Sequence, residues 1–176
     1  MSADRARLKE FLTRTPFFGG LDDEALDRVL GMLVAHEFPV GKKVFHKGDS
    51  GRSMYIVEAG ELVAYERGGS GRPVKLMRLR PGDFFGETTL IEMQPRPFSV
   101  VVDKPAVLHE LTNVDLYRLY EQDVTAYVMV LQNINRELCR RLRKAGNRIT
   151  EFADFAGDEG TQIRVDSKLP KPIDDE

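Results

Sequence analysis

The sequence lacks the residues on which several large protein classes depend. Its 176 residues include one cysteine, Cys139, and no tryptophan. A single thiol excludes an internal disulfide framework and a four-thiolate metal site. No apolar run reaches the ~18 residues of a membrane-spanning helix, and the charged segment from Met1 to Lys9 is not followed by an apolar secretory core. We therefore expect a cytoplasmic protein with no membrane partner.

An excess of charge of one sign is absent as well. The 26 basic and 28 acidic residues leave a formal net charge of −2, which gives no reason to expect non-specific binding to nucleic acid. The three histidines, His36, His46 and His109, are too scattered for the His-x-His metal site of a cupin-type enzyme. That enzyme class is the main rival for the strand pattern described next, so we expect no catalysis, no metal and no required cofactor.

Glycine is concentrated in one part of the chain. Nine of the 15 glycines lie from Gly41 to Gly86, and none lies between Glu87 and Ala145. Because glycine marks tight turns, the first stretch is typical of short strands and the later one of helix. Short apolar segments between such turns predict an antiparallel sandwich or barrel. The predicted strands are 43–46, 53–57, 61–65, 74–79, 98–102 and 107–111.

Helices are predicted on both sides of the strands. Asp22 can cap a helix that runs to about Val34, and Asn113 can cap a short one to about Tyr120. The last twenty residues contain few large apolar side chains, so we expect a disordered acidic tail that folding does not need. The expected organisation is N-terminal helices in 1–36, a strand region in 37–112, C-terminal helices in 113–156 and the tail in 157–176.

The predicted long helix from Val124 to about Phe155 has two apolar stripes. A helix of this kind usually faces its own domain with one stripe and a partner with the other. The second stripe follows the 4-3 spacing of a coiled coil, with Asn135 at an a position, which predicts a parallel homodimer. The first stripe is Tyr127, Val130 and Ile134; the second runs through Val124, Val128, Leu131, Asn135, Leu138, Leu142, Ala145, Ile149 and Phe152.

The most informative stretch runs from Pro81 to Val100. Gly86-Glu87 and Pro95-Arg96 stand at either end of a predicted short helical turn. Backbone N–H groups after Gly86 could meet an anion, and Arg96 could add a bidentate contact to a phosphate. Glu87 could accept hydrogen bonds from a ribose 2′-hydroxyl. A salt bridge between Glu87 and Arg96 would explain the same pair without any ligand.

The region from about Leu12 to Arg143 resembles the cyclic nucleotide-binding domain family of catabolite activator proteins and regulatory subunits of cyclic-AMP-dependent protein kinase. The resemblance implies a β-roll, or jelly-roll sandwich, with flanking N-terminal helices and a long C-terminal helix. The chain is similar to stand-alone, bacterial-type members without a helix-turn-helix. The matching motifs are Pro16-Phe17-Phe18, Phe45-His46-Lys47-Gly48-Asp49, Met54-Tyr55-Ile56-Val57, Gly60-Glu61-Leu62 and Gly82-Asp83-Phe84-Phe85-Gly86-Glu87 through Arg96.

The resemblance implies specific roles around the sugar and the phosphate of a cyclic nucleotide. Glu87 falls where the family's glutamate holds the ribose 2′-hydroxyl. Arg96 falls where its arginine pairs with the cyclic phosphate. Backbone groups at Gly86, Thr88 and Thr89 fall where the family lines the ribose-phosphate.

The resemblance also implies a side of the site that contacts the base. Leu76 and Met77 fall on the strand that approaches the base. The long helix falls where the family closes a lid, so Arg136, Arg140 or Arg141 is expected to touch the base, with no choice among the three.

Several positions depart from the family pattern. Thr88-Thr89 replaces a more usual pair of an apolar and a small residue. Pro97 stands where a small residue donates its backbone N–H to the phosphate, and proline has none; Phe98 replaces a second small residue. The threonine or serine that often accompanies a cyclic GMP preference is absent, so cyclic AMP is favoured. The predicted function is cyclic-nucleotide sensing, relayed to an unknown effector protein through the C-terminal helix. The alternative, kept open by Pro97, is a degenerate fold that serves as a ligand-free interaction or scaffold domain.

DNA is not an expected partner. In the family's transcriptional members a helix-turn-helix domain follows the long helix, whereas here we expect only the short tail at 157–176.

Overall fold

The structure is a computed structural model that describes residues 3–156. The predicted tail at 157–176 lies outside the described residues. The helices are α1 (Ala3–Thr13), the 3₁₀ turn η1 (Pro16–Phe18), α2 (Asp23–Met32), α3 (Thr88–Glu92), α4 (Asn113–Gln122) and α5 (Val124–Ala156). The strands are β1 (Val34–Phe38), β2 (Lys43–Phe45), β3 (Ser53–Arg67), β4 (Pro73–Leu79), β5 (Phe84–Phe85) and β6 (Ser99–Thr112).

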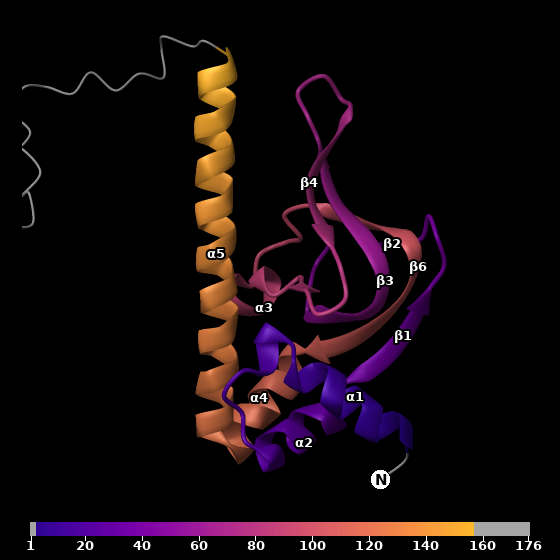
Figure 1. Cartoon of the computed structure of the whole chain (residues 1–176), viewed down its shortest axis with the longest axis vertical. Helices are drawn as coiled ribbons and strands as arrows, with labels where there is room; N and C mark the ends of the chain where they lie inside the picture. Colours follow the sequence, from indigo (N-terminus) through magenta and orange to yellow (C-terminus); the bar gives the residue numbers. More distant parts are fainter. Residues whose placement is uncertain (1–2, 157–176) are drawn as a thin grey trace, which may run out of the picture. The chain divides into compact units, whose positions relative to one another are not determined.

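All six strands belong to one antiparallel sheet. Its order is β1-β6-β3-β4, with β2 paired to β6 and β5 paired to β3. Helices α1, α2 and α4 gather at one end of the sheet, and the β3–β4 hairpin extends from the other end (Figure 1). The core between the strands is aliphatic and aromatic, and includes Phe45, Leu62, Phe85 and Leu108. The predicted class, mainly β with flanking helices and a long C-terminal helix, is confirmed.

Two pairs of predicted short strands are single long strands. β3 joins the segments 53–57 and 61–65, and β6 joins 98–102 and 107–111. Gly60 adopts φ +89°, and the pairing of β3 with β6 shifts register around it. A Cβ atom at Gly60 would lie 2.3 Å from the carbonyl oxygen of Pro105. The glycine that predicted a chain reversal therefore supports a bulge, which bends two paired strands without ending them.

Three element boundaries differ from the prediction. The helix expected to reach Val34 ends at Met32, because Leu33 is already extended, and β1 starts at Val34. Strand structure thus begins inside the segment 1–36 that was expected to be helical. Thr112, not Asn113, caps α4, in a reciprocal capping box with Asp115. Strand β5 was not predicted, since two residues are too few to show a periodicity.

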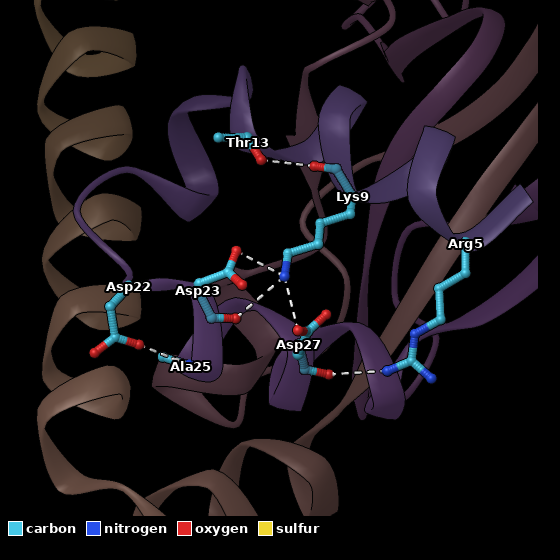
Figure 2. Close-up of polar contacts among 7 residues, drawn as sticks. All are labelled: Arg5, Lys9, Thr13, Asp22, Asp23, Ala25 and Asp27. Carbon is cyan, nitrogen blue, oxygen red and sulfur yellow. Dashed lines mark hydrogen bonds and ion pairs between the residues drawn. The ribbon is translucent and has the colours of Figure 1, made fainter. Parts of the chain in front are cut away.

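Charged contacts attach α1 to α2 (Figure 2). The ammonium group of Lys9 lies 2.7 Å from a carboxylate oxygen of Asp23 and 2.7 Å from one of Asp27. The hydrogen bond to Asp23 is the main reason that the pKa of Lys9 rises above its ordinary value. At the start of α2, the Asp22 carboxylate accepts a hydrogen bond from the backbone N–H of Ala25 (2.8 Å), which confirms the predicted cap.

Helix α5 begins after Asp123, as predicted, and its two stripes have different surroundings. Val130 and Ile134 of the first stripe are fully buried, whereas Leu142, Ile149 and Phe152 of the second are 67–74% exposed. The buried side also carries Asn133, whose amide nitrogen donates to the carbonyls of Phe17 (3.0 Å) and Gly19 (2.8 Å). The chain divides into two compact units between Glu137 and Leu138, within this helix.

Candidate functional site

Arg96 lies in the segment that connects α3 to β6, between Pro95 and Pro97. Neither proline has a backbone N–H, so neither can donate a main-chain hydrogen bond. Arg96 itself pairs its backbone with a neighbouring loop: its N–H donates to the carbonyl of Asp49, and its carbonyl accepts from Gly48, both at 2.9 Å. The side chain is 4% exposed. The sequence therefore places one long cationic side chain inside the protein, on a backbone fixed from both directions.

The Arg96 guanidinium is held by uncharged groups. Its Nη1 donates to the carbonyl of Gly86 (3.0 Å) and to the Thr89 hydroxyl (3.1 Å). Its Nη2 makes a long contact of 3.5 Å with the Ser53 hydroxyl. Its Cζ lies 4.2 Å from the centre of the Phe45 ring, in a cation–π arrangement. These partners orient the group but do not neutralise its charge.

Two glycines make room for this guanidinium. A Cβ atom at Gly51 would lie 2.6 Å from Arg96 Nε and 2.8 Å from Cζ. A Cβ atom at Gly86 would lie 2.5 Å from Nη1, and Gly86 also adopts φ +83°. Side chains at either position would therefore force the guanidinium to move.

The electrostatic state of Arg96 suits an anion-binding group. Burial lowers the pKa of its guanidinium, and the acidic groups of Tyr55, Glu110, Asp49 and Glu87 act in the opposite direction. An arginine stays protonated in proteins, and its guanidinium has five N–H donors. The Arg96 guanidinium forms three hydrogen bonds, with Gly86, Thr89 and Ser53. Its burial and its remaining donors both favour a negatively charged ligand.

Glu87 is buried beside this group, with 2% of its surface exposed, and occupies the N-cap position of α3. Its negative charge raises the pKa of Arg96. The Arg96 guanidinium donates to Gly86 and Thr89, and a Glu87–Arg96 salt bridge stays the alternative prediction.

The other residues expected on the phosphate side gather in the same segment. Gly86 and Thr89 are buried and both contact Arg96 directly, while Thr88 is half-buried. The Thr89 hydroxyl also donates to the Gly86 carbonyl at 2.9 Å, so its side chain has a role that sequence reasoning assigned only to backbone. Pro97 is exposed, and the half-buried Phe98 packs against the core, its ring 6.4 Å from that of Phe45.

The residues expected at the base are not brought together as one group. Leu76 and Met77 are successive half-buried residues of β4, at the point where its pairing with β3 shifts register. Met77 packs against the core. Arg136 donates to the Asn133 side chain within its own helix (2.8 Å). Arg140 and Arg141 belong to the unit that begins at Leu138, and their roles remain as the resemblance implies.

Sequence reasoning missed three residues that hold Arg96: Phe45, Gly51 and Ser53. Phe45 and Ser53 were assigned to strands and Gly51 was read as part of a turn, because their only sequence signals are apolar alternation and glycine spacing. None of these signals indicates proximity to an arginine more than 40 residues away.

Among residues 3–156, no helix is long and apolar enough to cross a membrane, and no three His, Cys, Asp or Glu side chains cluster as metal ligands.

Comparison with known proteins places this site in context. The family described as "Cyclic nucleotide-binding domain" matches residues 35–123, which include the whole segment from Gly86 to Arg96. The chain belongs to this family. The match also covers the six strands of the described residues, except the first residue of β1.

Relatives of this cyclic nucleotide-binding domain include a receptor protein and a protein kinase regulatory subunit. The cyclic AMP receptor protein of Thermus thermophilus is 30% identical over 135 residues, 74% of this chain and 59% of the relative. A cAMP-dependent protein kinase regulatory subunit of Neurospora crassa is 34% identical over 97 residues, 55% of this chain and 24% of the relative. The chain thus aligns with well under two thirds of the length of either protein.

Solved structures show the same fold. The Thermus thermophilus catabolite activator protein superposes with a TM-score of 0.70 and 29% identity, over 79% of this chain and 63% of that one. The predicted β-roll and the predicted family are therefore both confirmed.

A substitution at Gly51 tests whether the observed position of the Arg96 guanidinium is needed for ligand binding. Replacing Gly51 by alanine adds a Cβ against the guanidinium, and overpacking of this kind costs about 1–3 kcal/mol. We expect Gly51→Ala to weaken cyclic-nucleotide binding roughly 5- to 100-fold in calorimetric titration. Gly69→Ala is the matched control, because its Cβ meets no atom within 4 Å and its φ is not left-handed. Equal affinities for both variants would show that the ligand does not use this arrangement of Arg96.

Proposed function

We propose that this chain is a cyclic-nucleotide sensor, a regulatory binding module and not an enzyme, with Arg96 as its phosphate-binding residue. The observation that carries the proposal is the buried Arg96 guanidinium, which has neutral partners and donors to spare. A cyclic phosphate monoanion supplies the missing counter-charge and accepts a bidentate pair of hydrogen bonds. Glu87, buried at the start of α3, accepts a hydrogen bond from the ribose 2′-hydroxyl at the same site.

Cyclic AMP is the ligand that we favour. Two of the relatives carry cyclic AMP in their names, a receptor protein and a protein kinase regulatory subunit. Position 97, next to Arg96, is a proline and not the threonine or serine associated with cyclic GMP. Base recognition by Leu76, Met77 and one of Arg136, Arg140 or Arg141 is part of this proposal.

A chain of contacts links the phosphate segment to α5 and supports a relay through that helix. Gly86 follows directly on β5, whose Phe84 ring lies 5.3 Å from the ring of Phe17. The carbonyl of Phe17 accepts a hydrogen bond from the buried Asn133 side chain of α5. A shift of Gly86 on ligand capture therefore reaches α5 through two buried contacts, and ligand binding selects the helix position that fits the occupied site. The effector would be a cytoplasmic protein that recognises this helix.

Calorimetric titration of the purified chain tests the proposed function. We expect saturable binding of cyclic AMP, weaker binding of cyclic GMP and no binding of cyclic di-GMP at the same site. The sensor proposal would be overturned if none of the three ligands bound at about millimolar concentration. Such a result would mean a binding free energy weaker than about −4 kcal/mol.

A ligand-free scaffold is the second candidate, and Pro97 is the observation that favours it. The missing N–H removes one charge-assisted donor that the phosphate would otherwise receive. Because Pro97 is exposed, Pro97→Ala can restore the donor without disturbing the core. We expect Pro97→Ala to tighten cyclic AMP binding roughly tenfold, because a charged hydrogen bond contributes about 1.5 kcal/mol. If neither the parent chain nor Pro97→Ala binds any cyclic nucleotide, the scaffold function replaces the sensor.

A parallel homodimer through the exposed stripe of α5 completes the proposal. Val124 and Val128 are 54% and 42% exposed at the start of the helix, and the stripe continues with the exposed side chains of Leu142, Ile149 and Phe152. This heptad pattern presents an exposed apolar surface along the helix, and a second copy of the helix covers it by knobs-into-holes packing.

Introducing negative charge into that apolar stripe tests the homodimer. We expect Leu142→Glu/Ile149→Glu to convert the dimer to a monomer, because paired copies would bury four carboxylates in an apolar seam. Lys144→Glu/Asn147→Glu introduces two carboxylates outside the stripe and should leave the dimer intact. Light scattering at high micromolar concentration distinguishes these results. A monomeric parent chain, or the same mass for both double variants, would contradict the dimer.

A further inference from the structure

A second polar pocket lies outside the Arg96 site, at the start of β6. It has a volume of about 320 Å³. Strand β6 runs between β2 and β3 here, since Lys43 pairs with Val101 and Tyr65 pairs with Ser99. The loop after β2 closes the pocket, because the backbone N–H of Lys47 donates to the Ser99 hydroxyl at 3.0 Å. Arg96 is not part of its lining.

The lining of this pocket is mostly basic. Lys43, Lys47 and Arg67 bring three cations, against the single carboxylate of Glu66. Lys47 forms an ion pair with Glu66, so the charges of Lys43 and Arg67 remain uncompensated within the lining. Arg67 uses one nitrogen, Nη1, to hold the Gly71 carbonyl at 3.1 Å, which leaves the rest of its guanidinium for a ligand. His46, Tyr65 and Ser99 add neutral polar groups.

We propose that this basic pocket (Lys43, His46, Lys47 and Arg67) binds a small, multiply charged anion of the phosphate class. The volume stands at the lower end of the range for small-molecule sites, which suits a compact anion. Lysine and arginine on three converging segments provide both point charges and a planar fork for phosphate oxygens. The scarcity of apolar lining residues makes a hydrophobic ligand unsuitable.

The pocket adjoins the cyclic-nucleotide site without sharing side chains with it. The loop from His46 to Gly51 has the pocket on one side through His46 and Lys47, and the Arg96 guanidinium on the other through Gly51. Gly48 and Asp49 of this loop bond to the backbone of Arg96. The two sites are therefore separable by substitution, and the proposal does not depend on the proposed sensor function.

Calorimetric titration with inorganic pyrophosphate, at constant ionic strength, tests the pocket. We expect one saturable site per chain and at least a tenfold loss of affinity in Lys43→Ser/Arg67→Ser. Arg80→Ser/Arg118→Ser, which removes two exposed cations outside the pocket, and Arg96→Ala should both retain the parent affinity. A parallel titration with ATP identifies the source of the phosphate: tighter binding than pyrophosphate indicates a nucleotide, and equal binding indicates a free phosphate chain.

Three results would overturn the pocket proposal. One is the absence of saturable pyrophosphate binding at concentrations up to about 10 mM. That result would mean an affinity weaker than the millimolar range. Another is loss of binding in Arg96→Ala, which would place pyrophosphate in the other site. The third is an equal loss in both double variants, which would reduce the effect to overall charge. Cyclic AMP affinity, measured on Lys43→Ser/Arg67→Ser, should match that of the parent chain, so the two sites fail or succeed independently.

Discussion

Replacing Arg96 by alanine is expected to abolish detectable cyclic-nucleotide binding. The variant leaves the buried phosphate without its counter-charge, and breaking a buried charged pair costs about 3–5 kcal/mol. This corresponds to a loss of roughly 100- to 1000-fold or more in affinity. The effect is large because the buried guanidinium is held in place by Gly86, Thr89, Ser53 and the Phe45 ring, where it meets the phosphate directly.

Arg96→Lys separates charge from geometry in this experiment. Lysine keeps the positive charge but loses the planar fork, so we expect only a partial recovery of affinity. Thermal melting of both variants provides the control for folding. An Arg96→Ala chain that melts like the parent and still binds cyclic AMP with the parent affinity would exclude Arg96 as the phosphate-binding residue.

Replacing Glu87 by alanine is expected to have the second largest effect. Loss of a charged hydrogen bond costs about 1.5–3 kcal/mol, which is roughly 10- to 150-fold in cyclic AMP affinity. Because the proposed partner of Glu87 is the ribose 2′-hydroxyl, the variant should bind 2′-deoxy cyclic AMP about as well as the parent chain does. Titration of both proteins with both ligands measures the coupling between carboxylate and hydroxyl directly.

The coupling separates a binding role for Glu87 from a structural one. A structural role, for example in starting α3, would weaken both ligands equally in Glu87→Ala. Equal losses for cyclic AMP and its 2′-deoxy form would therefore contradict the assignment of Glu87 to the ribose.

The sequence was sufficient to predict the fold class, whereas the ligand roles of Arg96 and Glu87 stay a prediction. The positions of glycines and short apolar segments indicated antiparallel strands, and the 4-3 spacing after Asp123 indicated the long helix. Arg96 and Glu87 stood out through the resemblance of the segment from Gly82 to Arg96 to the family's motif, because the residues alone also allowed a simple salt bridge. These are local signals, and local signals survive folding when nothing else competes for the same residues.

The contacts that orient Arg96 could not be predicted because they join distant segments. Gly51 and Gly86 looked like ordinary turn glycines, yet in the structure each leaves space for the same guanidinium. Asn133 belonged to neither predicted stripe of α5 and carried no signal, although its buried amide donates hydrogen bonds to the carbonyls of Phe17 and Gly19. Gly60 suggested a turn, but a positive φ at a bulge and a positive φ at a chain reversal place the same demand on the residue.

A crystal structure of the chain with cyclic AMP is the most direct test of the proposed site. We predict a phosphate oxygen within hydrogen-bond distance, about 3 Å, of the Arg96 guanidinium, with the ribose 2′-hydroxyl beside the Glu87 carboxylate. Cyclic AMP bound elsewhere, with the guanidinium still donating only to Gly86, Thr89 and Ser53, would contradict the account.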